Sequence, residues 1–210
     1  DDIPQVGGKN ASLGEMHSHL APKGVNLPNG LATTAESYYY FLDSVGIRQQ
    51  VEDILAGLDV KNINDLKARG SKIRNLIIKS KFPKDFEDEI RRGYKELSQK
   101  CGKKNLVVAI RSSATAEDLP NASFAGQQET YLNIKGERNV LKATKKCIAS
   151  LFNDRAIVYR VENNFEHMKV ALSVGVQQMV AVRSRAAGIM FTVDTESGFE
   201  NAIVISSIYG

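Results

Sequence analysis

The spacing of apolar residues changes near residue 104, and this change constrains the fold more than any other feature. Before it, apolar residues recur every three or four positions, which predicts helices over 10–20, 38–45, 66–77 and 86–97. After it, short β-branched runs predict strands over 106–110, 129–134, 170–180, 188–193 and 202–208, with one helix over 140–151. The sequence therefore predicts an α+β chain, with a mainly helical part in residues 1–104 and a β-rich part in residues 105–210.

Composition limits the class of protein. The chain has 210 residues, 42% of them hydrophobic and 25% charged, so it is long enough to bury a core in one domain or two small lobes. It begins at Asp1 and stops after a strand-like run, so we expect a piece of a longer protein. A run of four tyrosine and phenylalanine residues, 38–41, is expected to pack into the core rather than to stack on bases.

Charge and cysteine usage point away from several partners. The net charge is +4, but the basic residues alternate with acidic ones, as in 79–89, so we expect no nucleic acid partner. No apolar run is long enough for a bilayer, so we expect no membrane partner. Cys101 and Cys147 lack metal or redox spacing and are expected to be reduced in the cytoplasm, with Cys147 buried in its helix.

The segment 111–130 holds the clearest candidate residues for binding a phosphate group. A strand ends near Arg111, whose planar guanidinium binds two phosphate oxygens at once, and a loop rich in small residues follows. The stretch 123–126 has the small residues of a flap that lets backbone N–H groups approach an anion. From the residues alone, an ordinary loop and a surface ion pair remain open.

Gly7, Gly8, Lys9 and Asn10 make a second, independent candidate. Two glycines followed by a lysine precede a predicted helix, whose amino terminus offers N–H groups to an anion. A simple turn with a solvated lysine remains open. The P-loop and dinucleotide glycine motifs are both absent from the sequence.

Six segments resemble the amino-terminal nucleotide-binding domain of the phosphoenolpyruvate synthase family. They are VGGKNASLGEM (6–16), ATTAESYYYFL (32–42), RSSATAEDLPNASFAGQQETYLN (111–133), ASLFNDRAIVYR (149–160), VALSVGVQQMV (170–180) and GIMFTVDTESGF (188–199). The resemblance implies an ATP-grasp type domain, of which this chain forms the first lobe. It also implies transfer of phosphate from ATP to a carrier histidine and then to pyruvate, with water as the second acceptor.

The resemblance also implies roles for individual residues. Lys9 and Arg111 match the phosphate-binding cations. The residues that match the flap over the triphosphate are Ser123, Phe124, Ala125, Gly126 and Thr130. The residues that match the strand edge facing adenine are Gln178, Met179 and Val180. Ligands for Mg²⁺ are expected beyond residue 210, as are the carrier-histidine domain and the pyruvate-binding domain of the same polypeptide. A homodimer of the full-length enzyme is a further expectation.

Three readings remain at this point. The first is the ATP-binding part of a phosphoenolpyruvate synthase, inactive as an isolated piece. The second is the equivalent part of a rifampicin phosphotransferase-like or pyruvate phosphate dikinase-like enzyme, since the segments at 111–118 and 123–130 resemble all three groups. The third is a noncatalytic binding protein with the same fold, which the presence of both Lys9 and Arg111 disfavours.

Overall fold

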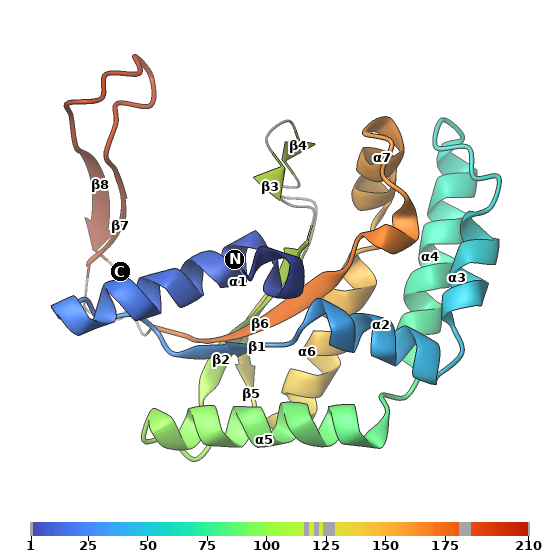
Figure 1. The fold of residues 1–210 in the computed structure, drawn as a ribbon, viewed down its shortest axis with the longest axis horizontal. Coiled ribbons are helices and arrows are strands. Elements are labelled where there is room, and N and C mark those ends of the chain that lie inside the picture. Colours follow the sequence, from blue (N-terminus) through green and yellow to red (C-terminus); the bar gives the residue numbers. More distant parts are fainter. Residues whose placement is uncertain (1, 116–117, 120–121, 124–128, 181–185, 210) are drawn as a thin grey trace. The chain divides into compact units, whose positions relative to one another are not determined.

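The computed structural model describes residues 2–115, 118–119, 122–123, 129–180 and 186–209 (Figure 1). The chain forms two compact units, Asp1–Met179 and Val180–Gly210. Helices and antiparallel strands occur together, so the predicted α+β class is confirmed. The division at residue 104 stays a prediction, although the first five α-helices all precede it.

Helices dominate the first hundred residues, as the spacing predicts. In chain order the elements are α1 (Ile3–His19), η1 (Ala21–Lys23), β1 (Gly30–Ala32), α2 (Ala35–Ser44), α3 (Arg48–Leu55), α4 (Ile63–Lys79) and α5 (Lys84–Lys100). Side chains cap two of them: Thr34 and Ser37 form a capping box at α2, and the Asn62 side chain accepts from N–H groups in the first turn of α4. Among these elements, the sequence patterns missed η1, α3 and β1.

Four antiparallel strands form the main sheet, in the order β1-β6-β2-β5. The remaining elements of this unit are β2 (Val107–Ala114), β3 (Asp118–Leu119), β4 (Ala122–Ser123), β5 (Thr130–Lys135), α6 (Glu137–Ser150), α7 (Asp154–Glu162), η2 (His167–Lys169) and β6 (Leu172–Gln178). β2 is therefore hydrogen-bonded on both edges, to β6 and to β5.

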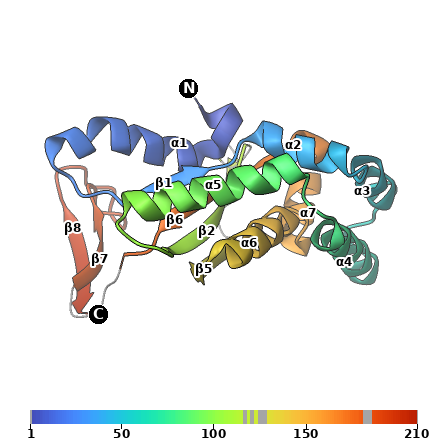
Figure 2. The same cartoon turned by 90° about the horizontal axis from the view of Figure 1, so that it is seen from below.

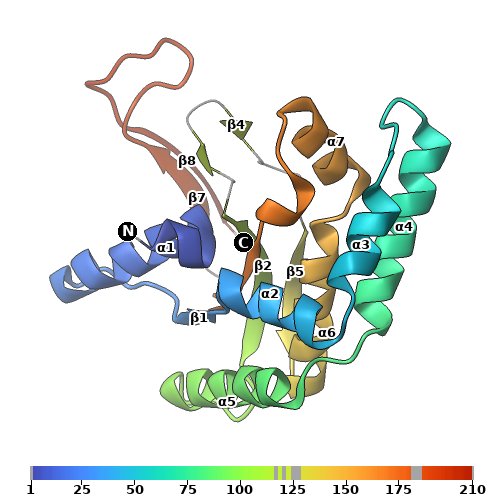
Figure 3. The same cartoon turned by 45° about the vertical axis from the view of Figure 1, so that its right-hand side comes forward.

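The two faces of the sheet carry different helices. α1 lies over one face, and α5 and α6 lie over the other (Figures 1 and 2). Successive residues of a strand point to opposite faces, so Val108 and Ile110 of β2 enter the core with Val140 and Cys147 of α6. Ser113, two residues after Arg111, instead faces α1. α4 packs beside α6 and α7, and α3 lies alongside α4 (Figure 3).

Aromatic packing follows the predicted pattern. Tyr38 and Phe41 are buried in the core, while Tyr40 is exposed and donates its hydroxyl to Asp85. Phe41 packs edge-on against Phe82, which packs in the same way against Phe86. These contacts confirm that the run 38–41 is a packing element.

The second unit contains a β-hairpin. β7 (Ala186–Phe191) pairs antiparallel with β8 (Val204–Tyr209), with Gly188 opposite Ser207. Within the described residues, no helix has both the length and the apolar content needed to span a membrane.

Candidate nucleotide site

A sharp bend in α1 creates a helix start inside the element. Gly7 has φ 72° and ψ 161°, a conformation essentially restricted to glycine, and the helix resumes after it. A Cβ on Gly7 would lie 2.6 Å from the carbonyl oxygen of Ser113 and 2.7 Å from its carbonyl carbon. The bend therefore seats α1 directly on β2 and places Lys9 in the first turn of the resumed helix.

Asn10 fastens α1 to two strands. Its backbone N–H donates to the Ser113 hydroxyl at 3.3 Å, and its side-chain amide donates to the Ser173 hydroxyl at 2.9 Å. A Cβ on Gly175 would lie 2.6 Å from the Asn10 side-chain oxygen, so a side chain at that point of β6 would displace the Asn10 amide. These contacts fix the distance between α1 and the sheet.

A cavity of about 160 Å³ lies between α1 and the sheet. Asn10 and Arg111 line it, together with β1 and the end of β6. The strands form the floor of this cavity. In their register, Gly175 of β6 lies opposite both Ala32 of β1 and Arg111 of β2. The small residues on one side of Arg111 leave room above them for a ligand.

Arg111 projects into this cavity from a fixed backbone. Its guanidinium donates to the Gln177 side-chain oxygen at 3.1 Å. On the other side, the register places Thr130 of β5 opposite Arg111, so the two side chains share a face. Two predicted site residues, Arg111 and Thr130, are therefore neighbours.

Lys9 follows the bend at Gly7 in α1, and its charge acts on the Cys147 thiol. Burial, and next the Glu129 carboxylate, raise the pKa of the Cys147 thiol to about 12, while the Lys9 ammonium lowers it. Glu129 immediately precedes Thr130, which lies opposite Arg111. Lys9 thus acts near the end of the sheet that carries Arg111, but Asn10 is the residue of this pair that lines the cavity. A common anion pocket for Lys9 and Arg111 stays a prediction.

The predicted flap lies mostly outside the described residues. Phe124, Ala125 and Gly126 are among those not described, and Ser123 is placed only as the last residue of β4. Their role over a triphosphate stays a prediction.

The predicted adenine edge is partly occupied by bonds within the protein. The Gln178 N–H donates to the Asn29 carbonyl at 2.8 Å, and the Met179 N–H donates to the Val107 carbonyl at 2.9 Å. Val180 begins the second unit. These two N–H groups are therefore not available to a base, and the role of residues 178–180 in binding adenine stays a prediction.

Sequence reasoning missed Gln177 and Gly175, which shape the cavity, and it missed the bonds by which Asn10 joins α1 to the strands. Asn10 and Gln177 bond to residues more than 60 positions away, and no local pattern reports such contacts. Gly175 did carry a signal, because a glycine inside a strand pattern often marks a close approach of another segment.

Comparison with known proteins agrees with the resemblance seen in the sequence. The model of the family described as pyruvate phosphate dikinase, AMP/ATP-binding domain, matches residues 3–210. The chain is 54% identical to a phosphoenolpyruvate synthase of Aquifex aeolicus (strain VF5) and 53% identical to one of Helicobacter pylori (strain ATCC 700392 / 26695). It is 49% identical to one of Escherichia coli (strain K12).

Each of these alignments covers 100% of this chain but only 24–26% of the relative. The chain therefore spans about a quarter of the length of the curated relatives it matches. Because the match extends over almost every residue, the chain belongs to the pyruvate phosphate dikinase AMP/ATP-binding domain family.

Proposed function

We propose that this chain is the ATP-binding portion of a phosphoenolpyruvate synthase. In this proposal the chain forms the first lobe of an ATP-grasp type domain and holds ATP while phosphate passes to a carrier histidine elsewhere in the protein. The carrier then phosphorylates pyruvate, and the overall products are phosphoenolpyruvate, AMP and phosphate. The names of the relatives and the AMP/ATP-binding family support this assignment.

The observation that carries the proposal is the position of Arg111 in the floor of the cavity. Phosphoryl transfer needs little covalent chemistry from the protein, so positioning and charge neutralisation supply most of the rate. Arg111 stands on a strand bonded along both edges, beside a glycine that leaves space for a ligand. A guanidinium in that setting suits an oxygen-rich anion.

The nucleotide is proposed to lie along β6. Its phosphates would sit near Arg111 and the start of the resumed helix, and its base near residues 178–180. The cavity volume of about 160 Å³ is below the roughly 300–1,000 Å³ of a complete small-molecule site. It therefore accounts for part of ATP, and the flap and residues outside the described ranges would supply the rest.

Mg²⁺ and the other partners extend the proposal beyond these residues. Among the described residues, no three His, Cys, Asp or Glu side chains are placed to hold a metal ion, so no step is assigned to one. The carrier-histidine domain, the pyruvate-binding domain and a homodimer belong to the full-length protein, whose relatives are about four times as long. A role in gluconeogenesis and a cytoplasmic location complete the proposal.

The test uses the full-length protein and ATP labelled in its β-phosphate. Arg111→Ala should slow labelling of the protein about 10²–10³-fold, the loss typical of one donor to a transition-state oxyanion. Arg92→Ala is the matched control, because Arg92 is exposed on α5 and pairs with Glu89 away from the cavity. It should label at the parent rate.

Product analysis distinguishes the proposed reaction from the related one. Pyruvate-dependent formation of AMP and inorganic phosphate, with water as acceptor, supports the synthase. Pyrophosphate as the product, with a requirement for added phosphate, supports a dikinase instead. Parent-like labelling by Arg111→Ala would refute the assigned role of the cavity.

A further inference from the structure

A second cavity, of about 550 Å³, lies along α6, which covers the face of the sheet opposite α1. The end of α4, the 80–83 connection and the start of α5 close its other sides. It is lined by apolar Ile78, Phe82 and Leu141, by cationic Arg138, Lys142, Lys145 and Lys146, and by Glu87. Its volume falls within the range of small-molecule sites, roughly 300–1,000 Å³.

The four cations of this cavity gather on one side of α6. They stand at positions i, i+4, i+7 and i+8 of the helix, spacings that bring side chains together. Within the described residues, none of the four forms an ion pair with a carboxylate. Four cations therefore line this wall, against one carboxylate, Glu87, among the described residues of the cavity.

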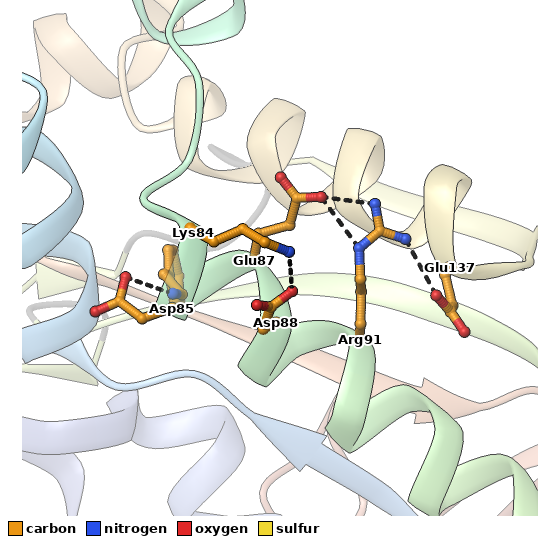
Figure 4. A network of polar contacts seen from close by, with 7 residues as sticks. Lys84, Asp85, Glu87, Asp88, Arg91 and Glu137 are labelled. Carbon is orange, nitrogen blue, oxygen red and sulfur yellow. Dashed lines mark hydrogen bonds and ion pairs between the residues drawn. The ribbon is translucent and has the colours of Figure 1, made fainter.

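On the neighbouring helix α5, by contrast, several cations form ion pairs with carboxylates. On α5, Lys84 bonds Asp88, and Arg91 bonds both Glu87 and Glu137 (Figure 4). Glu87 also lines the cavity, but its carboxylate already accepts two bonds from Arg91. It forms no ion pair with the α6 cations among the described residues, although its charge raises the pKa of Lys145 against the larger effect of burial.

Lys145 is held in place at the base of the wall. Its amino group donates to the Ser80 carbonyl at 2.6 Å and lies 4.8 Å above the centre of the Phe82 ring. Partial burial lowers the pKa of Lys145, because the charged amine loses hydration there. An incoming anion would meet a positioned ammonium beside an apolar floor.

We propose that this cavity binds a small organic polyanion, a molecule with two or more phosphate or carboxylate groups on a compact carbon body. The cations of α6 would bind the anionic groups, and Phe82 and Leu141 would contact the body. The site is separate from the nucleotide cavity, because the described residues that line the two are all different and lie on opposite faces of the sheet. The proposal is therefore independent of the function proposed above.

Two organic polyanions serve as probes: citrate and fructose 1,6-bisphosphate. Binding to the full-length protein is measured by isothermal titration calorimetry, at fixed ionic strength because exposed charges are screened by salt. Lys142→Met removes an exposed cation that makes no ion pair among the described residues, so folding should be preserved. With Lys145→Met added, Kd for the better probe should rise about tenfold or more, since charge-assisted bonds are lost.

The matched control is Lys95→Met, which removes the same charge from an exposed position on α5 outside the cavity. It should change Kd less than about twofold, as expected for a charge that is largely screened. Arg111→Ala should likewise leave Kd unchanged, because Arg111 lines the other cavity.

Three outcomes would overturn the proposal. The first is that neither probe binds at millimolar concentration. The second is that Lys95→Met weakens binding as much as the α6 variants, which would indicate attraction to overall charge alone. The third is that an acidic peptide binds in a Lys142-dependent manner and the small polyanions do not, which would indicate a protein-docking surface.

Discussion

Replacing Gly7 with alanine should detach the first turns of α1 from the sheet. Gly7 combines a backbone conformation that other residues rarely adopt with direct contact to the backbone of Ser113. A methyl group there meets atoms that have no free torsion with which to move aside. The substitution therefore tests whether the bend at Gly7 positions Lys9 and Asn10 over β2.

The magnitude follows from two separate effects. A non-glycine residue in this region of φ and ψ costs about 1–3 kcal/mol. Forcing an extra methyl group against packed atoms costs about 1–3 kcal/mol more, and the distances of 2.6 and 2.7 Å to Ser113 are well inside normal contact. Docking of α1 should therefore weaken by about 2–6 kcal/mol.

Hydrogen exchange of the α1 amides in the full-length protein measures how far the docking of α1 is weakened. A loss of 2 kcal/mol or more lowers protection at least about 30-fold when exchange follows the opening equilibrium. Gly46→Ala is the first control, since Gly46 has φ 66° but a methyl group there would meet none of the described atoms within 4 Å. It should cost only about 1 kcal/mol.

Gly14→Ala is the second control, in the same helix as Gly7. A Cβ on Gly14 would also have open space around it among the described residues, and no positive φ is involved. Alanine there should stabilise α1 by about 0.5–1 kcal/mol through helix propensity. If Gly7→Ala leaves α1 protection within the range of the Gly46 variant, the close seating of α1 on Ser113 is wrong.

Two further predictions concern polar contacts of the first unit. Asn10→Ala should cost about 1–3 kcal/mol, because it removes a bonding partner of the buried Ser173 hydroxyl, and a double-mutant cycle with Ser173→Ala should show coupling of about 0.5–1.5 kcal/mol in urea unfolding. Burial, and next the Arg160 charge, lower the pKa of His167 to about 4, below the ordinary 6.5. Its contribution to stability should thus be complete above pH 6.5 and fall as the pH drops toward 4, by about 1–2 kcal/mol after allowance for partial exposure. His167→Asn should flatten this dependence in unfolding curves from pH 4 to 7, and an unchanged slope would contradict the assignment.

The elements with a regular apolar stripe were predictable from sequence, and those without one were not. α4 and α5 were found because apolar residues follow one face over 66–77 and 86–97, within helices of 17 residues each. α7 was missed because Arg160 occupies a buried position and breaks the apolar pattern. β1 has only three residues, too few for an alternation to show.

The candidate site likewise has features that sequence patterns identified and features that they did not. Arg111 and Lys9 were identified because an arginine at the end of a predicted strand and a lysine after two glycines suggest anion binding, and the family resemblance strengthened both. The strand itself continues past Arg111 to Ala114. The Asn10 bonds depend on two strands that lie 60 residues apart in the chain. Local sequence carries no record of which distant hydroxyl a side chain will meet, so this part required the three-dimensional structure.

The bond between Arg111 and Gln177 makes ligand binding at the cavity an exchange of acceptors. The guanidinium already holds one neutral amide oxygen, so an arriving group must displace it before using the same N–H. An uncharged oxygen gains almost nothing from that replacement, whereas a phosphate offers two anionic oxygens to the fork. Gln177 thus competes with a ligand for this N–H group, and an anionic oxygen competes better than a neutral one.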